Sequence, residues 1–494
     1  MNTEPLKLSA FVHSFRLSSG QTFLANYLWR TFAELDGEEA SLFQSVRSGA
    51  RALSTMPESL LFRLREQKMV IEESLSESQF MSRKYDQNRF SDRVLGLTIA
   101  PTIDCNFACV YCYEERHPGR MTVETEAAIL SYVQTYLPGR RQFNVTWYGG
   151  EPLLCKETLY RLTESFLEVS RKEGTKYSAF MVTNGSLLTP DTVEKLAGYG
   201  HFSGIQITLD GSAAGHDEKR PTRGGKPTFQ TIWEHLLYAA PRLPMVLRMN
   251  VDLRNPAECH RLLTQLAEAG MPQTGLRVYF APIHPFGKGC RDIQEKEAVE
   301  ISTIREFAEI EIALTEHALQ LGFWRRRSLE GPWLAQCQSV STHTLVVEPD
   351  GSLQRCWIEV GEQDRRVGHI SEPLNLASDA NMRWLRFDPT RSAPCQHCEV
   401  LPICFGGCPQ RHIDGSPSEF ACREIRYNAR EMILLDYLGQ HPEQVRPPTV
   451  FVDEEYLSLP TWESRSRSPQ REQTSHAPAM RPDVPVAQLV RRRA

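Results

Sequence analysis

Long apolar runs are missing from this chain: no stretch of about 18 consecutive apolar residues occurs, so we expect no membrane-spanning helix. Residues 1–20 lack the continuous apolar stretch and the small-residue cleavage site of a signal peptide. The net charge is only −5, so we expect neither nucleic acid nor an anionic membrane as a partner. Internal repeats are also missing. We therefore expect a cytoplasmic protein, in a reducing compartment where disulfides rarely persist.

Cysteine, by contrast, is abundant, with 13 residues in the chain. In a reducing compartment, clustered cysteines are more often metal ligands or catalysts than disulfide partners. Ten of them fall into two groups, one from Cys105 to Cys112 and the other from Cys337 to Cys422. The remaining three are scattered and are expected to be buried thiols of the core: Cys155, Cys259 and Cys290.

The first 90 residues are predicted to form a small N-terminal α+β domain. Two short strands are expected within residues 7–28, around a turn at 18–21. Helical patterns follow at 37–47 and 57–67, and a further strand is expected at 69–73.

Residues 94–330 alternate apolar strands with amphipathic helices, which indicates right-handed βαβ units and a parallel sheet. We therefore predict a partial (β/α)6 barrel similar to a TIM barrel, with ligands bound at the C-terminal ends of its strands. The expected strands are 95–100, 143–148, 178–182, 205–209, 245–251 and 276–280. The expected helices are 123–136, 156–172, 190–198, 229–240, 257–269 and 295–321.

The rest of the chain has less regular structure. Residues 331–432 are rich in cysteine and are predicted to form a small C-terminal iron–sulfur domain, stabilised by metal rather than by a large core. Residues 433–494 form an extension that is largely a disordered tail, because 464–494 is rich in Pro, Ser, Arg and Gln.

The first cysteine group, Cys105, Cys109 and Cys112, has the spacing C-x3-C-x2-C and directly follows the first barrel strand. Three thiolates on one short loop can hold three irons of a [4Fe–4S] cube and leave the fourth iron open to a ligand. A zinc site completed by His117 is the alternative. The spacing, with aromatic Tyr111 before the third cysteine, resembles the signature of the radical S-adenosylmethionine (radical SAM) superfamily.

This resemblance implies a specific chemistry. In that family the open iron binds the amino and carboxylate groups of S-adenosylmethionine. One electron then cleaves the sulfonium bond and yields a 5′-deoxyadenosyl radical. An electron donor such as flavodoxin or ferredoxin is therefore an expected partner, and Tyr111 is expected to pack near the adenine.

A glycine-rich element, Gly149-Gly150-Glu151-Pro152, ends the second barrel strand. Glycines allow the backbone to approach a ligand closely, and the proline favours a turn, although an ordinary turn would use the same residues. The element resembles the family's GGEP segment, whose backbone and glutamate hold the methionyl amino group.

Further cofactor contacts are implied at later strand ends. Asn184 ends the third strand, and Thr208, at the end of the fourth, is expected to touch the ribose. Asn250, on the fifth strand, is expected to flank the adenine. His216-Asp217-x-x-Arg220 resembles a segment of peptide-modifying members, in which Arg220 would meet a carboxylate of cofactor or substrate. A solvated loop is the alternative there.

The second cysteine group resembles the SPASM domain that extends many radical SAM enzymes acting on peptides and proteins. The match covers seven cysteines and Gly351; a zinc ribbon is the alternative. The resemblance implies two auxiliary [4Fe–4S] clusters. The second of them has three cysteines and either a non-cysteine ligand or an open iron. The implied ligands are Cys395, Cys398, Cys404 and Cys422 for one cluster, and Cys337, Cys356 and Cys408 for the other.

Three functions are compatible with these motifs. The first is maturation of a ribosomally made precursor peptide by cross-linking, with the N-terminal domain capturing the peptide by strand addition. The second is oxidation of a sulfatase Ser or Cys to formylglycine. Relatives with that activity carry an Asp directly after the cysteine that corresponds to Cys356, where this chain has Trp357. The third is a non-catalytic iron–sulfur or zinc protein. No catalytic base stands out, although Asp210 or Glu359 could take a proton.

Overall fold

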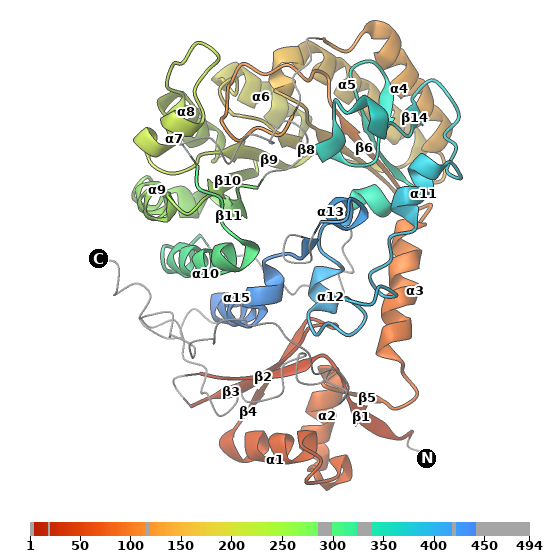
Figure 1. Cartoon of the computed structure of the whole chain (residues 1–494), viewed down its shortest axis with the longest axis vertical. Helices are drawn as coiled ribbons and strands as arrows, with labels where there is room; N and C mark the ends of the chain where they lie inside the picture. The colour runs from red at the N-terminus through yellow and green to blue at the C-terminus, as the bar shows by residue number, and fades with distance from the viewer. Residues whose placement is uncertain are drawn as a thin grey trace, which may run out of the picture.

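A sheet runs through the centre of the computed structural model, which describes residues 4–17, 20–114, 119–284, 299–323, 337–416 and 421–440. Six of its strands are parallel and lie in sequence order from the interior of the sheet out to one edge, each joined to the next by a helix that packs on the sheet (Figure 1). This arrangement confirms the predicted partial barrel. The parallel strands are β6 (Val94–Ile99), β7 (Gln142–Trp147), β8 (Lys176–Val182), β9 (Phe202–Thr208), β10 (Met245–Val251) and β11 (Arg277–Pro282).

The helices around these strands lie close to the predicted positions. Helix α10 begins later than predicted because Thr303 and Glu306 form a capping box at its start, and residues 295–298 lie outside the described residues. Helix α7 was not predicted as a helix. The helices are α4 (Val123–Tyr136), α5 (Lys156–Glu173), α6 (Pro190–Tyr199), α7 (Ala213–Lys219), α8 (Phe229–Ala239), α9 (Pro256–Glu268) and α10 (Ile304–Gln320).

The sheet continues on the other side of β6, which the sequence did not predict. Strand β12 (Thr344–Val347) pairs with β6 in parallel, and β13 (Ser352–Gln354) and β14 (Gly368–His369) follow as antiparallel neighbours. The start of the cysteine-rich region is therefore part of the same sheet as the barrel, rather than a separate layer. Gly96 permits this pairing, since a Cβ atom there would lie 2.8 Å from Cγ2 of Thr344.

The N-terminal residues form an antiparallel sheet of β2 (Val12–Arg16), β3 (Thr22–Asn26) and β4 (Thr31–Leu35), beside a pair formed by β1 (Leu6–Leu8) and β5 (Val70–Glu72). The predicted hairpin and two helices are present, whereas β4 and α3 were missed. Leu24, Phe43 and Leu60 pack together in the core of this unit. Its helices are α1 (Gly37–Arg47), α2 (Glu58–Glu66) and α3 (Glu77–Arg89), the last of which leads to the barrel (Figure 1).

Helix α15 (Ile425–Gln440) lies between α10 and the N-terminal sheet (Figure 1). The ring of Tyr437 stacks on Phe23 with centroids 4.1 Å apart, and the amide of Asn428 donates to the carbonyl of Ala308 at 3.2 Å. The boundary expected between residues 432 and 433 falls inside this helix. The other helices of the region are α11 (Asp379–Leu385), α12 (Leu401–Cys404) and α13 (Pro409–Ile413).

The scattered cysteines Cys155 and Cys259 are buried, as expected, whereas Cys290 lies outside the described residues. The expected tail at 464–494 and His117 also lie outside them. In the part of the chain that the structure describes, no helix has the length and apolar character needed to cross a membrane.

Replacing Gly96 by valine tests the pairing of β6 with β12. The added side chain collides with Thr344, so we expect the free energy of unfolding to fall by about 1–3 kcal/mol, as is typical of overpacked cores. Denaturant titration of the protein measures this change. The control is Gly37→Val, because nothing lies within 4 Å of the Cβ position of Gly37. Gly139→Val would not serve as a control, because Gly139 has a positive φ that would strain a valine. Equal stability of the Gly96 and Gly37 variants would contradict the account.

Candidate active site

The loop with the first three cysteines follows β6 at the C-terminal edge of the parallel strands, and its cysteines are partly exposed and form no disulfide. On one side, the N–H groups of Ala108 and Val110 donate to the carbonyls of Pro221 and Lys219, at 2.8 and 3.0 Å. On the other side, the loop after β7 donates a backbone N–H to the carbonyl of Asp104 at 2.9 Å. The backbone that carries these thiols is therefore hydrogen-bonded to neighbouring segments on both sides.

Gly149 and Gly150 are required by the packing of this loop. Gly149 has φ +105°, and a Cβ atom there would lie 2.3 Å from the carbonyl oxygen of Thr102. A Cβ atom on Gly150 would lie 2.3 Å from the carbonyl oxygen of Asp104. The sequence predicted a close approach to a ligand. In the structure, the group that approaches these glycines is the backbone leading into Cys105.

Glu151 is completely buried and joins the loops after β7 and β8. Its Oε1 accepts hydrogen bonds from the N–H of Leu153 at 3.0 Å and the hydroxyl of Thr183 at 2.7 Å. Its Oε2 accepts from the N–H of Asn184 at 2.7 Å. Burial raises the pKa of Glu151, although the three donors act in the opposite direction. Pro152 then begins a short 3-10 helix, so the loop is ordered on both sides of the carboxylate.

Tyr111 is fixed through its hydroxyl group. The hydroxyl donates to the carboxylate of Asp210 and accepts from Nδ2 of Asn250 at 3.0 Å and Nη1 of Arg220 at 2.9 Å. Asp210 is completely buried and also accepts from the N–H of Asn250 at 2.9 Å. Burial raises the pKa of Tyr111, so its hydroxyl stays protonated and remains a donor. The network ties the ends of β9 and β10 to the cysteine loop.

Arg220 and His216 belong to helix α7 and its end. Nδ1 of His216 accepts from the N–H of Asp210 at 3.2 Å, and Nε2 lies 3.1 Å from the hydroxyl of Thr228. Burial, together with the neighbouring cations, lowers the pKa of His216 well below its ordinary value, so the ring is neutral. The alternative of a solvated loop is wrong here, because Arg220 is only 6% exposed and its Nε is buried without a hydrogen-bond partner.

Two other predicted contacts, Asn184 and Thr208, are also buried at strand ends. Nδ2 of Asn184 lies 3.8 Å from Sγ of Cys105 and 2.8 Å from Oδ1 of Asn106. Thr208 ends β9 and is paired with Arg248 of β10. The structure thus brings Asn184 to the cysteine loop, and it places Thr208 at the same edge of the sheet.

An aromatic bridge that the sequence did not predict connects the two cysteine groups. Trp357 follows Cys356 and stacks on Tyr148, with ring centroids 5.2 Å apart and planes 18° apart. The hydroxyl of Tyr148 is hydrogen-bonded to that of Tyr113, which follows Cys112. Tyr148 is buried, whereas Trp357 is 37% exposed, so part of the indole is open to a substrate. The sequence did contain a signal for this bridge, because each aromatic residue is next to a residue of a motif. Tyr113 follows Cys112, Tyr148 precedes Gly149, and Trp357 follows Cys356.

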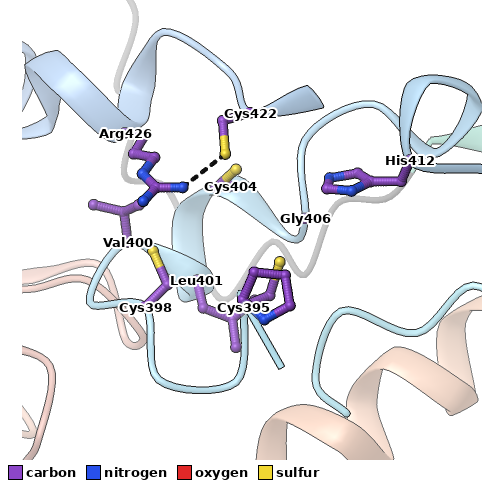
Figure 2. A pocket seen from close by; sticks show the side chains of 10 residues that line it. Cys395, Cys398, Val400, Leu401, Cys404, Gly406, His412, Cys422 and Arg426 are labelled. Atoms are coloured by element: carbon purple, nitrogen blue, oxygen red, sulfur yellow. Dashed lines mark hydrogen bonds between the residues drawn. The ribbon is translucent and has the colours of Figure 1, made fainter. Parts of the chain in front are cut away.

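Four of the C-terminal cysteines, together with Arg426, line one cavity, and Figure 2 shows their sulfur atoms around a common space. Burial and the neighbouring thiols raise the pKa of Cys395 to about 12 and that of Cys404 to about 11. Cysteine binds a metal as the thiolate. Because their pKa values are raised, these thiols lose their protons only when positive charge, such as that of bound iron, is present in the cavity. The donor set therefore fits an iron–sulfur cluster. The four are Cys395, Cys398, Cys404 and Cys422.

The remaining three, Cys337, Cys356 and Cys408, form the second set. Burial, followed by the thiols of Cys337 and Cys408, raises the pKa of Cys356 well above its ordinary value. The cavity brings together only the first four cysteines, so a second cluster held by these three stays a prediction, and its fourth ligand stays unassigned.

Of the two carboxylates named as possible bases, Asp210 is fully engaged, whereas Oε2 of Glu359 has no hydrogen-bond partner. Asp210 is engaged by Tyr111 and Asn250. Glu359 is 1% exposed and accepts from Nη2 of Arg383 at 3.4 Å, and burial raises its pKa to about 7. Both carboxylates make contacts that hold the fold together, and the catalytic base stays unassigned.

Comparison with known proteins agrees with this site. Residues 99–264 match the family described as the Radical SAM superfamily. Residues 99–264 therefore form a radical SAM domain, a class whose cofactors are S-adenosylmethionine and a [4Fe–4S] cluster, and the relatives indicate that the chain is an enzyme. The cysteines of the C-terminal region fit auxiliary clusters.

Individual relatives are distant. The chain is 25% identical over 351 residues to the serine-type anaerobic sulfatase-maturating enzyme of Klebsiella aerogenes, covering 64% of this chain and 80% of that protein. It is 28% identical over 178 residues to the sporulation killing factor maturation protein SkfB of Bacillus subtilis, covering 36% of this chain and 40% of that one. A solved structure of native anSMEcpe with bound AdoMet and Cp18Cys peptide has TM-score 0.53 and 19% identity, over 71% of this chain and 97% of that one. This last likeness shows the fold.

Replacing Glu151 by glutamine tests the loop geometry. An amide NH2 cannot accept a hydrogen bond, so at least one of the three donors loses its partner inside the protein. We expect the free energy of unfolding to fall by about 1–3 kcal/mol, the usual effect of a buried unsatisfied group. We also expect weaker S-adenosylmethionine binding by the iron-loaded protein, measured by equilibrium dialysis. Glu157→Gln, on an exposed residue in the next helix, is the matched control; if the two variants behave alike, Glu151 does not hold the loop.

Proposed function

We propose that this enzyme modifies a side chain of a ribosomally made precursor peptide and forms a cross-link within it. Cys105, Cys109 and Cys112 would hold the cluster whose open iron binds S-adenosylmethionine. When bound there, S-adenosylmethionine supplies a 5′-deoxyadenosyl radical that removes a hydrogen atom from a carbon of the substrate. The protein contributes orientation and the exclusion of water.

Residues of the chain would have different roles in this reaction according to where they lie in the site. The Gly149–Glu151 loop fixes the cysteine loop, and its backbone and Glu151 would face the methionyl amino group. Asn184, Thr208, Arg220 and Asn250 would surround the rest of the cofactor. Arg220 supports this role because its guanidinium is buried and its Nε has no hydrogen-bond partner, so a carboxylate there would be stabilised.

The observation that carries the peptide proposal is the placement of Trp357. It follows Cys356 directly and stacks on Tyr148, which follows β7, and part of its indole is exposed. A substrate side chain that reaches the cofactor would contact this exposed part. Indole has no basic group at neutral pH, which favours cross-linking over a reaction that needs a carboxylate base at this position.

The N-terminal unit supports a peptide substrate. Strand β4 pairs with β3 along one side, and among the described strands none pairs with its other side. Its residues are also partly exposed, unlike those of β2. A leader segment could therefore add as a further strand beside β4. An electron donor such as flavodoxin or ferredoxin is proposed as the second partner.

A second candidate is formylglycine formation in a sulfatase. It is favoured by the 25% identity over 351 residues to the Klebsiella aerogenes enzyme. The two candidates share the cofactors and the first hydrogen removal, and they differ in the product. A cross-linked peptide has no new carbonyl group, whereas formylglycine is an aldehyde.

The test is anaerobic incubation of the loaded enzyme with candidate precursor peptides and, in parallel, with a sulfatase-derived peptide containing Ser or Cys. Products are read by tandem mass spectrometry before and after treatment with an aldehyde-reactive hydrazide. We expect a hydrazide-resistant cross-link in a precursor peptide. A hydrazide adduct on the sulfatase peptide alone would overturn the cross-linking proposal and establish the second candidate.

Replacing Trp357 by alanine tests the substrate contact. Loss of an aromatic stacking partner should lower the rate of peptide modification roughly tenfold, while iron content stays unchanged. Trp357→Phe keeps a ring that can stack on Tyr148 and should retain most of the activity. Full activity of the alanine variant would show that the substrate does not use this surface.

A further inference from the structure

Arg426 makes a direct contact with one sulfur of the cavity lined by Cys395, Cys398, Cys404 and Cys422. Its Nη1 donates to Sγ of Cys422 at 2.9 Å, the dashed contact in Figure 2. Arg426 also lines the cavity itself, beside the other three cysteines. Its guanidinium therefore lies at the cavity and is hydrogen-bonded to one of the four thiols.

This positive charge is not neutralised by a neighbouring carboxylate. Among the described residues, no Asp or Glu forms an ion pair with Arg426. Arg423, the other cation that acts on the group, differs in this respect because its Nη2 donates to Glu424 at 2.8 Å. Arg426 is thus the cation whose hydrogen bond goes to sulfur.

The position of Arg426 is fixed by the helix that carries it. Arg426 lies in the first turn of α15, and Asn428 next to that turn has the non-helical angles φ −129° and ψ 15°. Nδ2 of Asn428 donates to the carbonyl of Ala308 at 3.2 Å and to Glu311 at 2.9 Å, which ties this kink to α10. The first turn of α15 therefore lies beside the cavity in a direction that differs from the axis of the rest of the helix.

We propose that Arg426 raises the reduction potential of the auxiliary cluster held by Cys395, Cys398, Cys404 and Cys422. The inference rests on the proposed function, because it takes these cysteines as the ligands. Gaining one electron makes a cluster more negative, so a hydrogen bond to a ligating sulfur and an unpaired positive charge stabilise the reduced form. Arg426 is a tuning residue that acts through the ligand Cys422 and does not touch substrate.

The experiment uses the full chain with Cys105, Cys109 and Cys112 changed to alanine, so that only auxiliary clusters contribute to the signal. In this background, Arg426→Leu, Arg426→Lys and the unchanged Arg426 are compared after anaerobic loading with iron and sulfide. A redox titration with dithionite, followed by electron paramagnetic resonance, gives the midpoint potentials. Iron and sulfide are counted on the same samples.

We expect one of the two auxiliary potentials to move to a more negative value in Arg426→Leu and to move less in Arg426→Lys, which keeps the charge. The matched control is Arg430→Leu, one turn further along α15, where the guanidinium donates to the carbonyl of Ser14 and lies over the ring of Phe15. This control should leave both potentials unchanged.

Two results would overturn the inference while the ligand assignment stands. One is an unchanged potential in Arg426→Leu with full iron content, and the other is loss of the cluster from that variant, which would indicate a structural role only. If the background protein itself loads no auxiliary iron, the assignment of Cys395, Cys398, Cys404 and Cys422 as cluster ligands fails, and the inference fails with it.

Discussion

Strand β6 pairs in parallel with β7 on one side and with β12 on the other, and this double pairing fixes the two cysteine groups relative to each other. The first cysteine loop follows β6. The chain that leaves β12 turns at Gly351, returns as β13, and reaches Cys356 and Trp357. Because hydrogen-bonded strands cannot shift independently, the first cysteine loop and the segment around Cys356 are held in a fixed relative position. The stack of Trp357 on Tyr148 follows from this, since Tyr148 directly follows β7, on the opposite side of β6.

Buried polar side chains also restrict the loops at the ends of the strands. Glu151, Asp210 and His216 are all completely buried, and each holds two segments together by accepting backbone N–H groups. Their polar contacts leave the cysteine loop little freedom, which suits a loop that must hold a cluster and its ligand in one geometry. Between α10 and the N-terminal sheet, the contacts of α15 likewise fix the first turn that carries Arg426.

The sequence predicted the elements whose pattern is local and missed those that depend on distant partners. Strand β10 and helix α4 have the predicted bounds because alternation and helical periodicity are read within one segment. Strand β12 was missed because its four residues, three of them apolar, are too few to show a periodicity, and the strand is defined by its pairing with β6. Helix α7 was missed because Gly215 and several charged residues give it no apolar helical periodicity. In the structure this helix is held by the burial of His216. The cysteine groups were found from spacing alone, whereas the Trp357–Tyr148 contact joins residues that no local pattern connects.

The account depends most on the claim that the strand-end cysteine loop performs radical chemistry with S-adenosylmethionine. The direct measurement is the amount of 5′-deoxyadenosine formed anaerobically by the iron-loaded protein with dithionite, compared with Cys109→Ala. We predict product from the unchanged protein and none from the variant, which retains two of the three cysteines of the loop. Equal product from both, or none from fully loaded protein even with candidate peptides present, would contradict the account.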